Sequence, residues 1–443
     1  MKFIKKVDPE IAELIKQEEK RQKETLMMIP SENIASHAVE EAMGSILGNK
    51  YGEGYPQRRY YQGNQFIDQL ETLVIERAKK LFKVEAVNVQ PLSGSPANFA
   101  VYTALLNPGD TIMGLSLSSG GHLTHGAPFT ASSKYFHSVQ YDTDKNGLID
   151  YDKLRTLAKK SKPKIIIAST TAYARILDWK KFSDIADEVG SFLMADISHL
   201  AGLIAAGVYP SPAPFVHIIT TTTHKTLRGP RGAMIMTTQK GLKKDPDLAK
   251  KINKGIIPGI QGGPHFNNIA AIGIALKEAS TNSFKRYAAQ ILKNAQILAS
   301  ELIKYDFNLI TGGTDSHLIL VDLRNKGLLG NTAAEGLESV RIVINRNGIP
   351  YDPNPPFYPS GIRMGTPGIT SRGMKEKETK IIAKLINQTI NALIETKIKL
   401  KINSEQEKDK KIRQEIIKKT PSLKQINKTV KQLCHKFPLT KQY

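Results

Sequence analysis

One lysine in this sequence is surrounded by residues suited to covalent chemistry. Residues 220–232 read TTTTHKTLRGPRG, with Lys225 after four threonines and His224. The apolar run 215–219 before them predicts a short buried strand, so Lys225 lies where a strand gives way to a loop. Desolvation and neighbouring cations there lower the pKa of a lysine and leave a free amine for a Schiff base. A solvated surface lysine is the ordinary alternative, and other segments must decide between the two.

Two glycine-containing turns offer sites for an anion. Ser93, Gly94 and Ser95 precede a helical pattern, with Pro96 where a first-turn proline is favoured. Free backbone N–H groups, two hydroxyls and the positive end of the helix dipole at such a start suit a phosphate. The turn at 257–264 (IPGIQGGP) could also present backbone amides. Each motif alone is equally typical of a simple cap or turn.

A carboxylate and two imidazoles suit an aromatic cofactor ring. The apolar run 192–195 leads directly into Asp196. A carboxylate at the carboxyl end of a parallel strand lies where α/β folds bind ligands, and it could pair with a protonated pyridine nitrogen. A helix-capping role for Asp196 is about as common. His122 and His125 lie in the glycine-rich stretch 120–126, where one imidazole could stack on a flat ring; with no carboxylate beside them, we expect no metal site.

A single arginine suits a substrate carboxylate. Arg363 lies in the strand-like segment 360–367 (SGIRMGTP), after a turn. Its guanidinium offers the bidentate geometry that an amino-acid carboxylate requires. A structural ion pair is the more frequent role of a lone arginine in a strand.

The segments that must position these residues alternate between helical and strand patterns. We predict helices at 69–82, 96–106, 151–161 and 179–189, and strands at 111–114, 164–168, 191–195, 216–221 and 233–237. This alternation indicates an α/β fold with a mainly parallel sheet covered on both faces. A helical pattern at 8–28 precedes it. After a helical stretch at about 264–304, predicted strands at 308–311, 317–322 and 341–344 and a helix near 375–396 indicate a smaller α+β domain.

We therefore divide the chain into an N-terminal arm (1–50), a large α/β domain (51–280), a small C-terminal α+β domain (281–403) and a basic helical extension (404–443). The extension shows helical spacing but few apolar anchors. Residues 401–443 hold 12 Lys and Arg against 4 Asp and Glu, a net charge of +8.

The composition excludes several classes of protein. The 443 residues are 40% hydrophobic and 23% charged, as in a soluble globular protein. The sequence has no apolar run near the ~20 residues of a membrane helix and no signal-peptide pattern. A single cysteine, Cys434, rules out an internal disulfide, and we expect a cytoplasmic location. The net charge of +22 is spread over the body without interleaved aromatic residues, so we expect no dedicated nucleic-acid partner.

Taken together, these segments resemble the serine hydroxymethyltransferases, a pyridoxal-phosphate-dependent family of the aspartate-aminotransferase fold type (fold type I). The resemblance extends from about residue 8 to about residue 400. Its motifs occur in the family's order and approximate spacing: SEN at 31–33, NKYGEGYP at 49–56, RYY at 59–61, QGGP at 261–264, and the segments 120–126, 220–232, 311–317 and 360–367. The resemblance implies a large domain with a mainly parallel seven-stranded sheet and a smaller α+β domain.

The resemblance also implies a cofactor site. Pyridoxal phosphate would bind Lys225 as a Schiff base, with His224 beside it. Asp196 would pair with the pyridine nitrogen, His122 would stack on the ring, and His199 would hydrogen-bond the phenolic oxygen. The other implied cofactor contacts are Gly94, Ser95, Thr171 and Thr222, together with Tyr51, Gly262 and Gly263 from a partner subunit.

A substrate site is implied in the same way. Arg363 and Ser31 would bind the substrate carboxylate, and Arg231 would support the site with Tyr61. Glu53 would transfer a proton at the serine hydroxymethyl group, positioned by Tyr60 and Tyr61. The implied folate contacts are Leu117, Gly121, His122, Leu123, Asn347, Pro355, Pro356 and Phe357.

The implied reaction is the reversible transfer of the serine hydroxymethyl carbon to tetrahydrofolate, which gives glycine and 5,10-methylenetetrahydrofolate. The implied assembly is a homodimer with shared active sites, or a tetramer. Two alternatives stay open: a folate-independent aldolase for threonine-type 3-hydroxy amino acids, and a degenerate RNA-associated protein that acts through its basic tail. The presence of Glu53, Tyr60, Tyr61 and Asn347 favours the folate enzyme.

A few positions depart from the family's usual pattern. Leu92 replaces a histidine, Pro96 a glutamine, Thr171 a serine and Pro355 a serine. None of these changes removes a proton-transfer, Schiff-base or carboxylate-binding group. Because Pro96 lacks a backbone N–H, we expect an effect on cofactor affinity rather than on the type of reaction.

Overall fold

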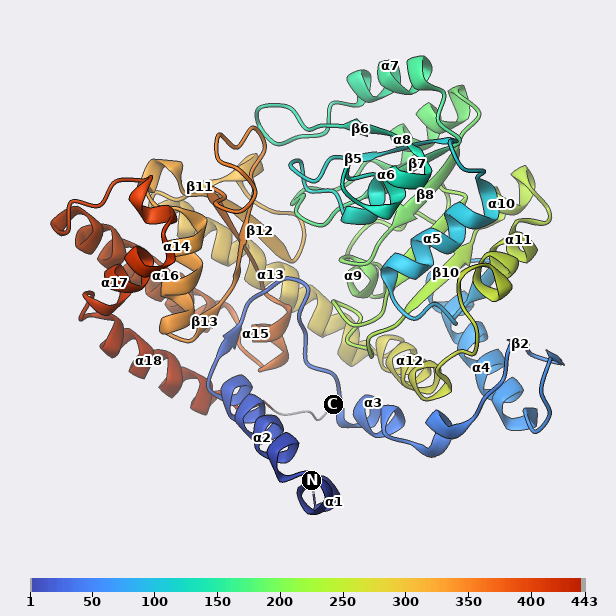
Figure 1. The fold of residues 1–443 in the computed structure, drawn as a ribbon, viewed down its shortest axis with the longest axis horizontal. Coiled ribbons are helices and arrows are strands. Elements are labelled where there is room, and N and C mark those ends of the chain that lie inside the picture. The colour runs from blue at the N-terminus through green and yellow to red at the C-terminus, as the bar shows by residue number, and fades with distance from the viewer. Residues whose placement is uncertain (1, 440–443) are drawn as a thin grey trace. The chain divides into compact units, whose positions relative to one another are not determined.

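The computed structural model describes residues 2–439. They form two compact units, one of residues 33–292 and one that combines residues 2–32 with 293–439. The chain passes from the first unit to the second within α13 (Asn282–Lys304) (Figure 1). Among these residues, none of the helices combines the length and apolar character that crossing a membrane requires.

The unit of residues 33–292 contains a seven-stranded sheet. Its strands, in spatial order, are β4 (Ala86–Asn88), β10 (Ala233–Thr237), β9 (Ile218–Thr222), β8 (Phe192–Asp196), β7 (Ile165–Ser169), β5 (Thr111–Leu115) and β6 (His137–Tyr141). Strands β9, β8, β7, β5 and β6 pair in parallel, whereas β10 runs antiparallel to both of its neighbours. The predicted α/β class, with a mainly parallel sheet of seven strands, is confirmed.

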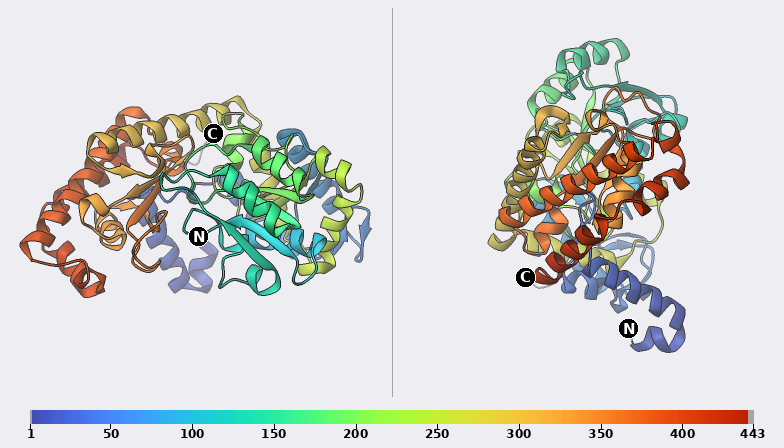
Figure 2. Two further views of the ribbon diagram at one scale, coloured as in Figure 1. Left: turned by 90° about the horizontal axis from the view of Figure 1, so that it is seen from above. Right: turned by 90° about the vertical axis from the view of Figure 1, so that its left-hand side faces the viewer.

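Both faces of this sheet are buried because its strands are apolar at successive positions. Ile165 and Ile167 belong to the apolar cluster that includes residues of α5 (Gly94–Leu105) and α11 (Leu248–Lys254). Ile166 and Ala168 belong to the cluster on the other face. That face is covered by α4 (Gln65–Phe82), α7 (Tyr151–Ser161), α8 (Trp179–Glu188) and α12 (Phe266–Ala279) (Figure 2). Each fully buried isoleucine contributes about 2 kcal/mol of transfer free energy.

The predicted elements of this unit are confirmed within a few residues, but the two edge strands of the seven-stranded sheet and the short hairpin of β2 (Gly54–Tyr55) and β3 (Arg58–Arg59) were missed. The five predicted strands are β5, β7, β8, β9 and β10, and the four predicted helices are α4, α5, α7 and α8. The pattern does not predict the edge strands. β6 is polar and only partly buried, and β4 has three residues, so neither shows the apolar run of a central strand. The predicted helical stretch 264–304 is two helices, α12 and α13.

The second unit is built on a four-stranded antiparallel sheet. Its spatial order is β11 (Asn308–Leu309), β12 (Leu318–Asp322), β15 (Gly361–Gly365) and β14 (Asn345–Asn347). The long helix α16 (Glu376–Lys399) and α14 (Gly330–Ser339) share its apolar core. The small α+β architecture expected here is present.

The prediction of one helix over 8–28 was wrong at its carboxyl end. Helix α2 (Pro9–Lys23) begins at the N-cap Asp8, whose carboxylate accepts a hydrogen bond from the Ile11 amide. Beyond it, β1 (Leu26–Met27) pairs in parallel with β13 (Ile342–Val343). Leu26 and Met28 are fully buried in the core of this unit. The burial of these side chains in the strand conformation outweighs the helical pattern of the segment.

The extension has more apolar anchors than its sequence suggested. Helices α17 (Lys410–Lys418) and α18 (Leu423–Lys436) pack against the core of this unit. The buried side chains of α18 recur at helical spacing: Leu423, Ile426, Val430, Leu433 and Cys434. Its lysines lie on the remaining face, so an amphipathic helix accounts for much of the tail's charge.

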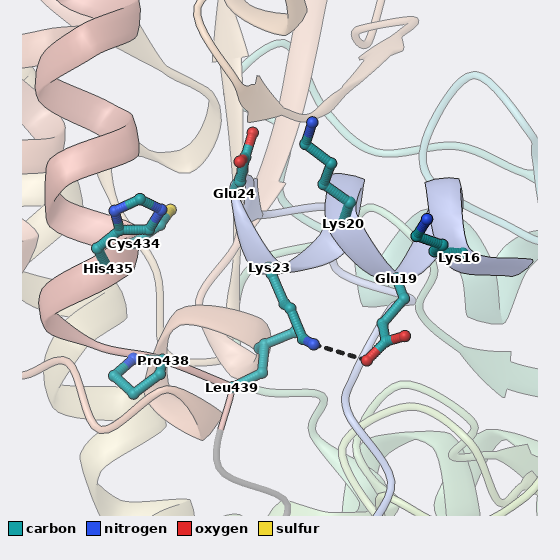
Figure 3. Close-up of a pocket in the computed structure, with 9 residues that line it drawn as sticks. All are labelled: Lys16, Glu19, Lys20, Lys23, Glu24, Cys434, His435, Pro438 and Leu439. Carbon is teal, nitrogen blue, oxygen red and sulfur yellow. Dashed lines mark hydrogen bonds and ion pairs between the residues drawn. The ribbon is translucent and has the colours of Figure 1, made fainter.

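Arg372 joins α18 to the N-terminal helix. Its buried guanidinium donates hydrogen bonds to the main-chain oxygens of Cys434 and Phe437, and to those of Gln22, Lys23 and Thr25. The carboxyl ends of α2 and α18 therefore share one cation, which also suits the negative ends of their dipoles. Beside it, the two helices border a cavity of about 530 Å³ (Figure 3). Lysines of α2 line one side, and His435 and Pro438 line the other.

Candidate active site

Asp196 ends β8 and is the centre of a buried hydrogen-bond network. Its Oδ2 accepts bonds from Asn98 Nδ2 at 2.9 Å and pairs with His125 Nε2 at 3.2 Å. Its Oδ1 accepts the hydroxyl of Ser198 at 2.6 Å and the Ser198 amide at 3.1 Å. Burial alone would raise the pKa of Asp196, but the hydrogen bond and charge of His125, with the bond from Asn98, outweigh it and hold the pKa well below its usual value. Asp196 is therefore ionised at neutral pH.

Two members of this network have roles that the sequence did not predict: Asn98 was not singled out, and His125 was named only as an imidazole that could stack on a ring. Asn98 is fully buried in α5 and also donates to Thr124 Oγ1, while it accepts the hydroxyl of Thr220 at 2.7 Å. His125 is fully buried, and its Nδ1 accepts the amide of His122. The only sequence signal for Asn98 is its place four residues after Gly94, on the buried side of the same helix. We call Asp196, Asn98, His125, Ser198 and Thr220 the Asp196 cluster.

His122 is held in this network in a neutral form. Its Nδ1 lies 2.9 Å from Thr124 Oγ1, and its ring lies 5.5 Å from that of His125. Burial, with the charge of His125, lowers the pKa of His122 to about 4. A neutral imidazole can stack on an aromatic ring without bringing a charge against a protonated pyridine.

Lys225 lies beside the Asp196 cluster. Its Nζ donates to Thr222 Oγ1 at 2.8 Å, and its carbonyl accepts from Asn33 Nδ2 at 2.8 Å. The Thr222 amide donates to Ser198 Oγ, the same hydroxyl that binds Asp196. A short chain of hydrogen bonds therefore runs from the amine to the carboxylate. The neighbouring His224 is neutral, because burial and the charge of Lys225 lower its pKa to about 3.

The start of α5 lies against the same residues. A Cβ added to Gly94 would lie 2.7 Å from Thr222 Cγ2, so only glycine allows this approach. Helix α5 begins at Gly94 with Ser93 as its N-cap. Pro96 falls in the first turn, where an amide has no intrahelical partner, so the helix tolerates its missing N–H. The free amides at this end and Ser95, which is exposed, remain available to an anion.

A second group of site residues gathers around Tyr51 and Glu53. Tyr51 donates its hydroxyl to Glu53 Oε1 at 2.8 Å, and its ring meets that of Tyr61 edge to face at 5.1 Å. A Cβ at Gly263 would lie 2.7 Å from the Tyr51 ring, and one at Gly262 would lie 3.0 Å from Glu53 Oε1. We call these five residues the Tyr51 cluster. Tyr51 is 53% exposed and Tyr61 is 45% exposed.

The hairpin that carries Glu53 is fixed by a buried arginine. Strands β2 (Gly54–Tyr55) and β3 (Arg58–Arg59) form this hairpin. Arg59 donates to the carbonyl of Gly54 and pairs with Asp68 at 2.9 Å and Glu71 at 2.6 Å, both on α4. The Tyr60 amide donates to the Glu53 carbonyl at 3.1 Å. The backbone around Glu53 is therefore rigid, while its side chain remains half-buried.

Arg363 and the remaining predicted contacts of its unit lie near one another along the sheet. Arg363 is central in β15, opposite Asn345 of β14, whose Oδ1 accepts its Nε at 3.3 Å. Burial lowers the pKa of Arg363 to about 10, which leaves it charged at neutral pH. Asn347 pairs with Gly361 in the same two strands, and Gly365 of β15 packs against Pro30, next to Ser31.

Loops supply the other predicted contacts. Pro355, Pro356 and Phe357 lie exposed in the loop before β15, which Asp352 holds by accepting bonds from the amide and hydroxyl of Ser360. In the other unit, Leu117, Gly121 and Leu123 follow β5, and the Thr171 amide donates to the Gly120 carbonyl. His199 is buried, and its carbonyl accepts the Thr226 hydroxyl. Arg231 is exposed, and its carbonyl accepts a bond from Asn268.

Comparison with known proteins decides between the families that such a site suits. The family model described as serine hydroxymethyltransferase matches residues 4–386. The chain is 54% identical over 391 residues to the serine hydroxymethyltransferase of Desulfotalea psychrophila, across 88% of this chain and 90% of that protein. It is 54% identical over 387 residues to that of Acidothermus cellulolyticus, across 87% and 89%.

The chain belongs to the serine hydroxymethyltransferase family. Members of this family are pyridoxal-phosphate-dependent one-carbon transferases of fold type I that use tetrahydrofolate as a substrate, so the predicted family, fold class, function and cofactors are confirmed. Helices α17 and α18 lie beyond the matched residues.

The residues present fit pyridoxal phosphate. The cofactor needs an amine for its aldehyde, a carboxylate for its ring nitrogen and donors for its phosphate. Lys225, the ionised Asp196 and the glycine-led start of α5 supply these groups. Thr222 contacts Lys225 through its hydroxyl, approaches Gly94 with its methyl and is linked to Asp196 through the hydroxyl of Ser198. The chemistry and mutual position of the donors therefore match the cofactor.

Proposed function

We propose that Lys225 binds pyridoxal phosphate and Asp196 pairs with its ring nitrogen in the serine hydroxymethyltransferase reaction of this chain. The observation that supports this proposal is the hydrogen-bond chain from Lys225 through Thr222 and Ser198 to an ionised, buried Asp196. When bound, the cofactor stabilises the electron pair left on the amino-acid carbon as its hydroxymethyl group departs. A permanent negative charge at Asp196 keeps the ring nitrogen protonated, which makes the ring a stronger electron sink.

The start of α5 binds the phosphate through its free amides and the Ser95 hydroxyl. His122 stacks on the ring as a neutral imidazole, and Thr171, Thr222 and His199 complete the contacts. His224, neutral as well, shapes the site beside Lys225. The proposal for the phosphate is supported by the close approach of Gly94 to Thr222, which brings the helix end next to the reactive amine.

Arg363 binds the substrate carboxylate, assisted by Ser31, with Arg231 and Tyr61 as supports. The charge and burial of Arg363 support this role, since a desolvated guanidinium has a strong preference for a carboxylate partner. Folate binds against Leu117, Gly121, His122 and Leu123. Asn347 and the loop of Pro355, Pro356 and Phe357 supply further contacts.

Glu53 moves the proton of the serine hydroxyl as the carbon–carbon bond breaks, with Tyr60 and Tyr61 beside it. The support is that Glu53 keeps a free carboxylate oxygen on a rigid hairpin, with one oxygen bound by Tyr51. A half-buried carboxylate with a neutral donor can change protonation, whereas one that is buried against several donors cannot.

We further propose a homodimer with shared active sites, with a tetramer as the larger form. Tyr51, Gly262 and Gly263 then serve the partner's cofactor. Because Glu53 and Tyr61 lie in the same cluster as these three residues, they serve the partner's site as well. Exposed apolar side chains on α1 (Lys2–Val7) and α2, such as Val7 and Leu14, are consistent with burial against a second copy.

The remaining proposals concern location and partners. We propose a cytoplasmic protein of four segments (1–50, 51–280, 281–403 and 404–443) that acts on small molecules and has no dedicated nucleic-acid partner. The free, buried thiol of Cys434 suits a reducing compartment, and burial raises its pKa to about 11, so it stays protonated.

Glycine release from serine, with and without tetrahydrofolate, tests the function. We expect folate-dependent release by the protein loaded with pyridoxal phosphate, and none by a Lys225→Ala variant. Cleavage of a threonine-type 3-hydroxy amino acid with no folate stimulation of serine turnover would favour the aldolase instead. Loss of both activities, with tight and salt-sensitive RNA binding that disappears on deletion of 404–443, would favour the RNA-associated protein.

A further inference from the structure

A tight turn follows β5 and contains the predicted folate contact Leu117. The Ser119 amide donates to the Ser116 carbonyl, the Gly120 amide to the Leu117 carbonyl and the Gly121 amide to the Ser116 carbonyl. A Cβ at Gly121 would lie 1.8 Å from the Leu115 carbonyl oxygen, so the backbone closes on itself here. Leu117 projects from this turn with 38% of its surface exposed.

Asp142 on the neighbouring strand holds this turn through its side chains. Leu115 and Tyr141 pair at the ends of the parallel strands β5 and β6, so the next residues, Ser116 and Asp142, lie side by side. Asp142 Oδ1 accepts the Ser116 hydroxyl in a short hydrogen bond and the Ser119 hydroxyl at 3.1 Å. Charge-assisted bonds of this kind are about twice as strong as neutral ones.

The serines extend this contact through the turn. Ser116 Oγ also accepts the Ser119 amide at 3.2 Å and lies 3.0 Å from Ser118 Oγ. Ser119 Oγ accepts the Thr143 amide at 3.1 Å, so the backbone beyond β6 is tied to the same group. One carboxylate oxygen of Asp142 therefore accepts hydrogen bonds from two hydroxyls. These hydroxyls in turn bind the backbone of the turn after β5 and the backbone that follows β6.

The cofactor-facing part of the same loop has a separate anchor. His122 is held by Thr124 and by the His125 ring, and His125 in turn is held by Asp196. Loss of Asp142 therefore loosens the residues before Gly121 and leaves the histidines in place.

We infer that Asp142 is a positioning residue for tetrahydrofolate: its contacts with Ser116 and Ser119 fix the turn that presents Leu117 to the folate. This inference rests on the proposed folate contact of Leu117. Asp142 itself is exposed and touches none of the residues assigned to the cofactor. The turn meets one proposed cofactor contact, through the bond from the Thr171 amide to the Gly120 carbonyl, so we expect the loss of Asp142 to weaken folate binding far more than cofactor binding.

Steady-state kinetics of Asp142→Ala and of Ser116→Ala/Ser119→Ala test the inference in the pyridoxal-phosphate-loaded enzyme. We expect the KM for tetrahydrofolate to rise roughly tenfold in both, while kcat, the KM for serine and the visible absorption of the bound cofactor stay within about twofold. Asp142→Asn keeps an acceptor oxygen at Oδ1 and should fall between Asp142→Ala and the wild type.

Asp144→Asn is the matched control. Asp144 accepts the amides of Asn146 and Leu148 and so holds the adjacent turn, without contact to the serines. It should leave the folate KM unchanged. Hydrogen exchange adds a second readout: amides of 116–121 should exchange faster in Asp142→Ala, and those of 122–126 should not.

Three results would overturn the inference. They are an unchanged folate KM in Asp142→Ala, an equal rise in Asp144→Asn, and a change in serine KM and cofactor absorption as large as that in folate KM. A wild-type enzyme that releases glycine without any folate dependence would instead contradict the proposed function, and the inference with it. The wild-type measurement thus separates the two failures.

Discussion

Two carboxylates of this molecule lie in opposite surroundings. Asp196 is 6% exposed, and both of its oxygens accept hydrogen bonds from Asn98, His125 and Ser198. Glu53 is half-buried on a hairpin, and the bond from Tyr51 occupies one of its oxygens. The first carboxylate is surrounded by donors that stabilise its charge. The second has the hydroxyl of Tyr51 as its hydrogen-bond donor.

The difference in surroundings suits two proposed roles for a carboxylate in one fold, a persistent charge and the transfer of a proton. A charge that must persist is desolvated and then compensated by several donors, which holds the pKa of Asp196 well below its usual value. Glu53, for which we propose proton transfer, is held at its backbone by Arg59 and accepts a side-chain hydrogen bond from Tyr51. The side chain of Asp196 is therefore fixed by its hydrogen-bond donors, whereas Glu53 is fixed through the backbone of its hairpin.

The largest effect is expected from Asp196→Asn. The amide cannot supply the negative charge that keeps a ring nitrogen protonated, and it leaves the donors of Asn98 and His125 without an anion. We expect kcat/KM to fall about 10³-fold or more, with weaker cofactor binding. Cofactor titration and glycine release measure the two effects. Asp184→Asn, at an exposed ion pair on α8, should match the wild type; an active Asp196→Asn would contradict the account.

Glu53→Gln should have a smaller and different effect. The amide retains the size and the bond from Tyr51 but cannot take a proton, so kcat with serine should fall about 10²-fold. Cofactor affinity and absorption should not change, because Glu53 has no place in the Asp196 cluster. The exposed Glu76→Gln on α4 is the control. A clear change in cofactor absorption or affinity in Glu53→Gln would contradict the prediction that Glu53, unlike Asp196, acts on the substrate and not on the cofactor.

His125→Ala tests one donor to Asp196, and it also removes the acceptor of the His122 amide. We expect a roughly tenfold loss in kcat/KM, because Asn98 and Ser198 still stabilise the carboxylate. The exposed His137→Ala serves as control. The same loss in an Asp196→Asn background would show that His125 acts on its own rather than through Asp196.

The smallest effect concerns stability in acid. The pKa values of His122 and His224 are lowered to about 4 and about 3, so both rings are neutral in the folded protein and take up protons on unfolding below the usual value of 6.5. Stability is therefore lost as the pH falls through that range, by about 1 kcal/mol for each ring between pH 7 and 5.5. Urea unfolding followed by the fluorescence of the single tryptophan, Trp179, measures it. The dependence of the unfolding free energy on pH between 7 and 5.5 should be weaker in His224→Asn than in the wild type. It should be unchanged in His37→Asn, an exposed control.

Much of the large unit could be predicted because its central strands are short apolar runs that end in chemically distinctive residues. β8 ends in Asp196, and β9 leads to Lys225, so pattern and chemistry coincide. The edge strand β6 could not be predicted in this way, since only the last of its five residues is buried and its sequence is largely polar. Asn98 was missed, and the pairing of His125 with Asp196 was not predicted, because both depend on contacts between segments distant in the sequence, which sequence spacing does not reveal.

The extension (404–443) shows a second reason why the sequence did not predict part of the structure. The buried side chains of α18, such as Ile426 and Val430, are diluted by lysines and appear as scattered apolar residues in the sequence. They become anchors because Arg372 fixes the end of the helix on the carbonyls of Cys434 and Phe437. No local pattern indicates that an arginine about 60 residues earlier caps this helix.

We propose that Asp196, which holds the charge, and Glu53, which moves the proton, act in one site but come from different subunits. Hybrid dimers of Lys225→Ala and Glu53→Gln protomers test it directly. If Glu53 serves the partner's Lys225, co-refolding the two weakly active variants in equal amounts restores about a quarter of the wild-type activity, since half of the dimers then contain one intact site of two. If both residues serve the same subunit's site, the mixture stays as inactive as its components, and the account is contradicted.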